Sequence, residues 1–328
     1  MSKRISLSAR LRAGERALAP LDWALAALTP LQRMGMAYRL RQPRIKVDAY
    51  VIAFGNITVG GTGKTPAVIE RATQEVAAGK TVAIVSRGYG SERCDEPFIV
   101  VPGEAVDGLA SIAGDELALI RMRVPEVTIV KSADRVAGAR AAIEQGCDTI
   151  ILDDAYQAVQ LERDENICVV DASLPFGNGH IIPRGILREP LNALGRATHF
   201  ILTHCDQCDD VNALTKQLQH YSAEASIRTT QHSVTGLWRV SDGASFPLTK
   251  LTEQPVHGAC AIAHPDQFRA TLETYTPLAS FHSNRDHATF LSPTLPDGEI
   301  LVVTEKDAVK MVQAKDWVFA LGISLKGY

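Results

Sequence analysis

The chain has 328 residues, of which 46% are hydrophobic and 22% charged, a balance that excludes wholesale disorder and predicts one large or two smaller buried cores. Its six cysteines are scattered and no cleavable signal-peptide pattern is present, so we expect no disulfide framework and a reducing cytoplasm. The net charge of −3 is unevenly divided: residues 1–48 carry ten Lys and Arg against three Asp and Glu, so this segment is +7 and the remainder −10. The N-terminal segment is therefore expected to lie against an anionic neighbour.

An apolar stretch, residues 17–31, lies between the basic clusters of this segment. It is shorter than the ~20 residues that a membrane span requires, and two prolines and Asp22 interrupt it. Its basic flanks, with Trp23 and Tyr38 able to sit at headgroup depth, predict a helix lying in the surface of an anionic membrane leaflet. The alternatives are a helical arm packed on the protein's own core and, less favoured because the rest of the chain is acidic, a nucleic-acid contact.

The run 47–54 is typical of a buried strand and leads into a glycine-rich loop. The loop consists of Thr58, Val59, Gly60, Gly61, Thr62, Gly63, Lys64 and Thr65. It matches the phosphate-binding pattern G-x-x-x-x-G-K-[ST] except at the first position, where Thr58 replaces glycine. In such a loop backbone N–H groups surround the phosphates, the lysine meets the β- and γ-oxygens, and the final hydroxyl binds Mg²⁺. The loop predicts a nucleotide site, with a chance glycine-rich turn as the alternative.

Further short apolar runs alternate with helical patterns along the chain. They lie at 81–85, 98–101, 127–130, 149–152, 167–170 and 200–202. Together with the loop, they predict an α/β fold of the P-loop NTPase type, a mostly parallel sheet with helices on both faces. A Thr- and Ser-rich stretch at 231–240 resembles an exposed hairpin or connector, and the pattern beyond it predicts a smaller C-terminal α/β domain. We therefore expect a membrane-surface segment at 1–46, a P-loop core domain at 47–232 and a C-terminal domain at 233–328.

Two adjacent acids, Asp153 and Asp154, follow the predicted strand 149–152. In phosphoryl-transfer enzymes a carboxylate in this position orients Mg²⁺ on the nucleotide. Adjacent acids after a strand are also ordinary turn or helix-capping residues. The glycine-rich loop upstream favours the metal interpretation.

Taken in order, these motifs and several other segments resemble the tetraacyldisaccharide 4′-kinases, which phosphorylate a lipid A precursor. The matching segments are 55–66, 86–90, 114–116, 153–154, 175–179, 183–185, 187–191 and 304–310. The Phe-Gly-Asn-Gly run at 176–179 and the Leu-Arg-Glu-Pro-Leu run at 187–191 separate this family from other P-loop proteins. The resemblance implies transfer of the γ-phosphoryl of ATP, with Mg²⁺, to the 4′-hydroxyl of tetraacyldisaccharide 1-phosphate. It also implies a peripheral or monotopic enzyme at the cytoplasmic face of the inner membrane. We expect no nucleic-acid partner and no obligate protein partner.

The resemblance assigns roles to single residues. Asp115 matches the family's catalytic carboxylate, His287 matches the histidine that assists it, and Lys64 holds the transferred phosphoryl. The implied metal ligands are Thr65, Asp153, Asp154 and Glu189. The side chains expected to face substrate or phosphate are Arg87, Arg135, Gln157 and Arg188. Without the resemblance, Asp115 would be interpreted as a helix N-cap and His287 as a surface histidine.

Two positions depart from the family pattern. Ala158 stands where a histidine is usual, so any contact made there is missing. Ala288 replaces the second of two adjacent histidines, which leaves His287 to act alone.

Two other features have weaker functional interpretations. The pair Cys205 and Cys208 is a lone C-x-x-C, which we expect to be a loop rather than a metal or redox site. The run 304–307 resembles a base-recognition corner, with strand-terminal charge as the simpler account. The alternative functions are a P-loop regulatory NTPase or metallochaperone, or a kinase of a small soluble acceptor. Neither needs a membrane-surface segment, so the N-terminal segment discriminates against both.

Overall fold

The computed structural model describes residues 30, 34–89, 91, 97–106, 108–262, 265–284, 295–311 and 314–328. Most of the expected interfacial helix, including Trp23, lies outside the described residues, as does His287. Residues 34–41 are helical and largely exposed. None of the described helices is both long and apolar enough to cross a bilayer.

A core unit precedes a smaller C-terminal unit in the chain. The core elements are β1 (Tyr50–Gly55), α3 (Lys64–Ala77), β2 (Val82–Ser86), β3 (Phe98–Val100), α4 (Leu109–Ala113), α5 (Asp115–Arg123), β4 (Thr128–Lys131), α6 (Arg135–Glu144), β5 (Thr149–Leu152), β6 (Glu165–Asp171), η1 (Leu191–Arg196), β7 (His199–Thr203), η2 (Cys205–Gln207) and α7 (Val211–Tyr221). The strand β8 (Ser226–Arg239) follows, and then the C-terminal unit contains β9 (Ser245–Phe246), η3 (Leu248–Thr252), β10 (Val256–Cys260), α8 (Pro265–Glu273), β11 (Leu278–Ser283), β12 (Ile300–Thr304), α9 (Glu305–Ala308) and β13 (Val318–Gly327).

The strands of the described residues form one sheet in the order β11-β10-β12-β13-β8-β7-β6-β1-β5-β2-β4-β3, with β9 beside β8. The pairings are parallel except those of β3 with β4, β13 with β8 and β9 with β8. The strand that leads into the glycine-rich loop, β1, lies between β6 and β5. The carboxyl ends of the parallel core strands therefore meet at one edge, around that loop.

Helices cover both faces of the core part of the sheet. Successive strand residues point to opposite faces, so each strand buries one set of side chains under the helices of each face. In β1, Ile52 and Phe54 pack with buried residues of α3 and α5, whereas Val51 and Ala53 pack with buried residues of α6. Complete burial of a side chain as large as Ile52 or Phe54 contributes roughly 1.5–3 kcal/mol to the free energy of folding. The expected α/β fold, a mostly parallel sheet with helices on both faces, is confirmed.

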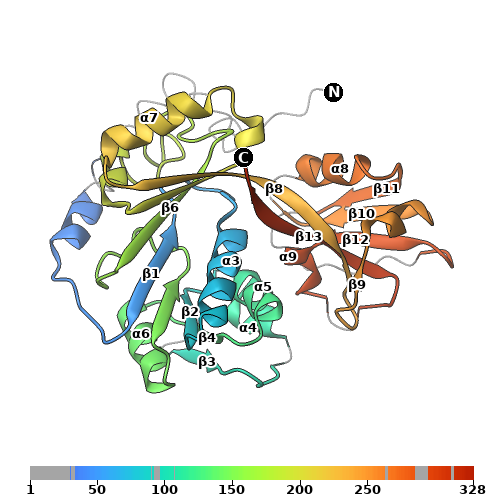
Figure 1. Cartoon of the computed structure of the whole chain (residues 1–328), viewed down its shortest axis with the longest axis horizontal. Helices are drawn as coiled ribbons and strands as arrows, with labels where there is room; N and C mark the ends of the chain where they lie inside the picture. The colour runs from blue at the N-terminus through green and yellow to red at the C-terminus, as the bar shows by residue number, and fades with distance from the viewer. Residues whose placement is uncertain are drawn as a thin grey trace.

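Strand β8 belongs to both units. Its residues 226–229 pair in parallel with β7, and residues 230–239 pair antiparallel with β13. Figure 1 shows β8 and β13 crossing together from the core unit to the C-terminal unit. The stretch 231–240, expected as an exposed hairpin or connector, is thus a connector, and nearly all of it belongs to the continuous strand β8. The end of β8 also forms a hairpin with β9. The expected division between 232 and 233 falls inside this strand.

Candidate functional site

The glycine-rich loop joins β1 to α3 and ends at the N-terminus of that helix. Gly60 has φ 116° and Gly63, the N-cap residue, has φ 73°, a backbone region that side-chain-bearing residues rarely adopt. The Thr62 hydroxyl is buried and has no hydrogen-bond partner among the described residues. Unpaired N–H groups at a helix N-terminus and its dipole attract anions, so this loop suits the phosphates of a nucleotide.

Thr58, the irregular first position of the loop, forms a β-bridge with Leu187 of the Leu-Arg-Glu-Pro-Leu run. On either side of it, Val59 N donates to Ile186 O at 2.8 Å and Arg188 N donates to Ile57 O at 2.6 Å. Extended backbone suits a β-branched residue and needs no glycine, which explains why threonine fits here. The bridge also holds two segments that are far apart in the chain against each other.

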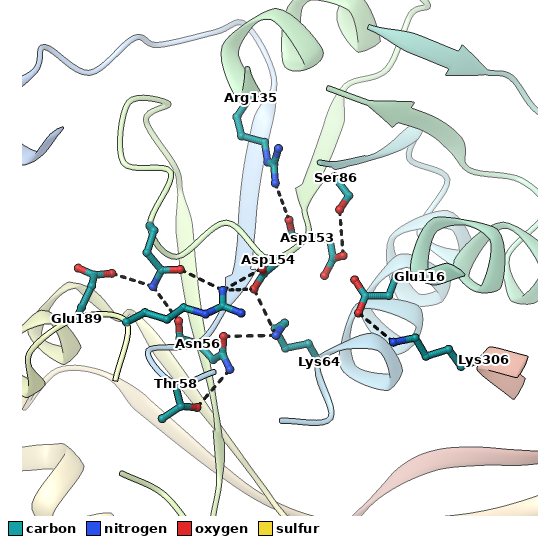
Figure 2. A network of polar contacts seen from close by, with 12 residues as sticks. Asn56, Thr58, Lys64, Ser86, Glu116, Arg135, Asp153, Asp154, Glu189 and Lys306 are labelled. Atoms are coloured by element: carbon teal, nitrogen blue, oxygen red, sulfur yellow. Dashed lines mark hydrogen bonds and ion pairs between the residues drawn. The ribbon is translucent and has the colours of Figure 1, made fainter. Parts of the chain in front are cut away.

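Lys64, the first residue of α3, points into a polar network (Figure 2). Its ammonium lies 3.3 Å from Asp154 Oδ1 and donates to Asn56 Oδ1 at 3.4 Å. Asn56 in turn donates to the Thr58 hydroxyl. Lys64 is therefore held by groups from the ends of both β1 and β5.

Asp153 and Asp154 are adjacent but differ in their surroundings. Asp153 is 1% exposed and accepts a hydrogen bond from Ser86 Oγ at 3.3 Å. Burial, followed by the nearby Glu116 carboxylate, raises the pKa of Asp153 to about 7. Burial also opposes ionisation of Asp154, but Lys64 and Arg188 outweigh it and lower its pKa to about 2. A cation at this edge of the sheet would stabilise the ionised form of Asp153, which burial disfavours.

The oxygen donors beside the loop fit Mg²⁺. The ion favours hard oxygen ligands and usually keeps several waters, with one or two carboxylates and the nucleotide phosphates completing its shell. Thr65 and the Asp153/Asp154 pair supply such donors. The described residues contain no group of three or more His, Cys, Asp or Glu that could hold a metal ion.

Glu189 is 1% exposed and is engaged by neighbours. Arg196 Nη2 lies 2.8 and 2.9 Å from its two carboxylate oxygens, and Gln157 Nε2 donates to it at 2.9 Å. Arg196 also lies over the Tyr156 ring, 4.8 Å from its centroid. These contacts give Glu189 a structural role as the holder of Gln157, and its expected role as a metal ligand stays a prediction.

The three expected arginines, Arg87, Arg135 and Arg188, differ in their surroundings. Arg135 is buried, donates to Ser132 O at 2.6 Å and to Asp153 O at 3.3 Å, and its Nε has no partner among the described residues. Burial, together with the charge of Arg87, lowers the pKa of Arg135 to about 10. Arg87 itself is exposed just after β2. Arg188 Nη1 donates to both carboxylate oxygens of Asp154 at 2.9 Å. The buried guanidinium of Arg135 beside Asp153 suits an anion such as a phosphate.

Asp115 is the first residue of α5, and Gly114, with φ 98°, is the N-cap. The reading of Asp115 as the N-cap is therefore wrong by one position. Asp115 lines a small recess with Ser86, Tyr89 and Glu116. Its carboxylate lies 3.2 Å from Lys310 Nζ, a contact with the C-terminal unit. His287, the predicted partner of Asp115, lies outside the described residues.

The two weaker features have structural accounts. Cys205 and Cys208 are free thiols that pack into or against a buried cluster with Leu202. In the run 304–307, the Thr304 side chain caps α9 by accepting from Asp307 N, and Asp307 is fully buried. The simpler interpretation, charge at the end of a strand, therefore accounts for the geometry of this run.

Sequence reasoning did not single out several residues of the site. Asn56, Ser86, Glu116, Arg196 and Lys310 all contact a predicted site residue or lie beside one. All of these except Arg196 do lie in segments that carried the family resemblance. Nothing in the sequence, however, indicates which distant residue each of them meets.

The fold and the site define a P-loop nucleotide-binding enzyme. The phosphate loop and the acidic end of β5 form the nucleotide part of the site, and a separate carboxylate, Asp115, lies at the start of α5. A model of the LpxK family, described as tetraacyldisaccharide-1-P 4′-kinase, matches residues 14–326. The chain belongs to this family, and it is an ATP-dependent kinase that uses ATP with Mg²⁺.

Relatives and a solved structure agree with this assignment. The chain is 36% identical over 282 residues to a tetraacyldisaccharide 4′-kinase of Anaeromyxobacter dehalogenans strain 2CP-1, covering 82% of this chain and 74% of the relative. It is 35% identical over 312 residues to that of Stenotrophomonas maltophilia, covering 92% and 88%. The crystal structure of LpxK from Aquifex aeolicus in complex with ATP superposes with a TM-score of 0.78 at 29% identity, covering 93% of this chain and 95% of that one.

Proposed function

We propose that this chain transfers the γ-phosphoryl group of ATP to the 4′-hydroxyl of tetraacyldisaccharide 1-phosphate in lipid A biosynthesis. The observation that carries the proposal is the joining of the phosphate loop to the Leu-Arg-Glu-Pro-Leu run through Thr58 and Leu187, in a member of this kinase family. The first segment serves any nucleotide, whereas the second is distinctive of the family. Their contact supports one site that serves both nucleotide and lipid.

The nucleotide half of the proposed reaction uses the loop and its neighbours. Backbone N–H groups at the start of α3 and the Lys64 ammonium bind the phosphates, and Arg135 faces the transferred group. Thr65, Asp153 and Asp154 would hold Mg²⁺, which when bound would neutralise charge on the phosphate oxygens. Asp154, ion-paired with Lys64 and Arg188, also keeps these two cations in place.

The acceptor half centres on Asp115. An ionised carboxylate at the start of α5 is in a position to accept the proton of the attacking hydroxyl, and His287 would share that load. Tyr89, 74% exposed, and Arg87 lie on the loop after β2 that borders the same recess, where they would contact a sugar or its phosphate. The role of the dyad stays part of the proposal.

Attachment to the membrane surface is proposed from the N-terminal segment. Met34 and Tyr38 are each 68% exposed and Leu40 is 42% exposed, beside basic residues at 39, 41, 44 and 46. Exposed apolar side chains among cations suit an anionic leaflet, and a kinase of a lipid must reach its substrate there. We place the protein at the cytoplasmic face of the inner membrane as a peripheral or monotopic enzyme.

The test is a transfer assay with γ-labelled ATP, Mg²⁺ and tetraacyldisaccharide 1-phosphate, followed by location of the label on the product. The proposal predicts one label per lipid, at the 4′ position. ATP hydrolysis without label on the lipid would favour a regulatory NTPase or metallochaperone instead. Transfer to a soluble sugar in preference to the lipid would favour the small-acceptor alternative.

A further inference from the structure

Lys310, just beyond α9, joins two carboxylates that belong to different units. Its ammonium lies 3.2 Å from Asp115 Oδ2 in the core unit and 3.1 Å from Asp307 Oδ1 in the C-terminal unit. The side chains of Lys310, Asp115 and Asp307 are only 9%, 15% and 0% exposed. Ion pairs this well shielded from water interact strongly and are costly to leave half-formed.

The C-terminal side of this contact is rigid. Asp307 Oδ2 accepts from Ala261 N at 2.9 Å and from Thr304 Oγ1 at 2.6 Å, so the carboxylate is fixed at the ends of β10 and β12. Its other oxygen, Oδ1, accepts from Lys310. Lys310 is thereby anchored to the C-terminal unit while its ammonium reaches Asp115.

The same boundary carries two further ion pairs between α5 and α9. Lys306 forms an ion pair with Glu116, drawn in Figure 2, with the two charged atoms 4.0 Å apart, and Arg123 pairs with Glu305. The elements α5 and α9 therefore lie side by side with their charges matched along the contact. Among these ion pairs, the one formed by Lys310 includes Asp115, the carboxylate that accepts the hydroxyl proton in the proposed function.

An ammonium at this distance restricts the rotamer of a general base, and so the direction from which the carboxylate oxygen approaches the acceptor hydroxyl. Misplacement of a reacting group by about 1 Å can cost about 100-fold in rate. The contact is thus well placed to affect turnover rather than nucleotide binding.

We propose that Lys310 is a positioning residue for Asp115, through which the C-terminal unit fixes the carboxylate that serves the acceptor hydroxyl. This inference rests on the proposed function, because it takes Asp115 as the group that receives the hydroxyl proton. Lys310 itself acts through Asp115. The consequence is that the C-terminal unit contributes to catalysis even for nucleotide already bound to the core unit.

The experiment compares Lys310→Met, Lys310→Gln, Lys310→Arg and the control Lys315→Met in the full-length protein. Lys315 is an exposed lysine of the same unit. For each variant, kcat, the KM of ATP and of the lipid, the Kd of ATP and the thermal unfolding midpoint are measured. Lys310→Met and Lys310→Gln are expected to lose 10- to 100-fold in kcat with the Kd of ATP within twofold of wild type, Lys310→Arg to recover much of the loss, and Lys315→Met to match wild type.

A merely structural role would lower the unfolding midpoint and ATP affinity without lowering kcat for folded enzyme, and Arg would give no kinetic rescue. If Lys310→Met fails to fold, the Gln and Arg variants decide between the two outcomes. An active wild type, an inactive Asp115→Asn and a Lys310 variant that keeps full kcat would overturn this inference and leave the proposed function standing. A wild type that transfers nothing to the lipid would overturn both.

Discussion

The ammonium of Lys64 lies 3.3 Å from the carboxylate of Asp154, which also accepts two hydrogen bonds from Arg188 at 2.9 Å. The carboxylate at the end of β5 thus positions one cation from the phosphate loop and one from the Leu-Arg-Glu-Pro-Leu run. Both cations are thus held in place by a side chain of the protein itself. Preorganisation of this kind reduces the reorganisation that the transition state would otherwise require.

Replacement of Lys64 tests the phosphate half of the site. Lys64→Ala should lower kcat/KM for phosphoryl transfer by at least about 100-fold, because the charge that meets the transferring phosphoryl is lost. Steady-state kinetics with saturating lipid measure the change. Lys80→Ala, an exposed lysine just beyond α3, is the control and should behave as wild type. A Lys64→Ala enzyme within fivefold of wild type would contradict the assignment.

The buried pair of Arg196 and Glu189 makes a prediction about stability. Arg196→Met leaves a carboxylate that is 1% exposed without its cation and should lower the free energy of unfolding by about 3–5 kcal/mol. Denaturant titration measures the loss, and adding Glu189→Gln to the same chain should restore part of it. Arg269→Met breaks an exposed pair with Glu273 and should cost about 1 kcal/mol or less. Equal losses for the two arginines would argue against a buried charge pair.

His232, on β8, gives a pH dependence with a defined sign. Burial, and then His204, lower the pKa of His232 to about 4, against about 6.5 in an unfolded chain. The unfolded state therefore binds the extra proton between these values, and the contribution of this residue is present above pH 6.5 and lost as the pH falls to 4. Between pH 7 and 4, wild type should lose up to about 3 kcal/mol of unfolding free energy more than His232→Gln. Parallel pH curves for the two proteins would contradict the burial argument; His220→Gln, exposed on α7, is the control.

Removal of residues 1–46 tests membrane attachment. The full-length chain should sediment with vesicles that contain anionic lipid and bind much less to zwitterionic vesicles, whereas the shortened chain should stay in solution with both. The shortened chain should still bind ATP, because the phosphate loop and its partners lie beyond residue 46. Sedimentation of the shortened chain to the same extent as the full chain would place the attachment elsewhere.

Local signals in the sequence predicted the elements but not their long-range contacts. Apolar runs identify the buried strands, and Gly60 and Gly63 identify the loop, because these depend on neighbouring residues in the chain. The bridge from Thr58 to Leu187 and the ion pair from Asp115 to Lys310 join distant segments, and no periodicity indicates such pairings. The alternating Thr and Ser of 231–240 predicted a connector, but its continuity with β7 and β13 follows only from the sheet order.

In the proposed reaction, the loop at Lys64 binds the nucleotide while Asp115 serves the acceptor. The most direct measurement compares Asp115→Asn with wild type in ATP binding by calorimetry and in a single-turnover transfer of labelled phosphoryl to tetraacyldisaccharide 1-phosphate. Asp115→Asn should bind ATP with an affinity within about threefold of wild type and transfer phosphoryl about 100-fold or more slowly. Loss of ATP binding, or transfer at the wild-type rate, would contradict this assignment of roles.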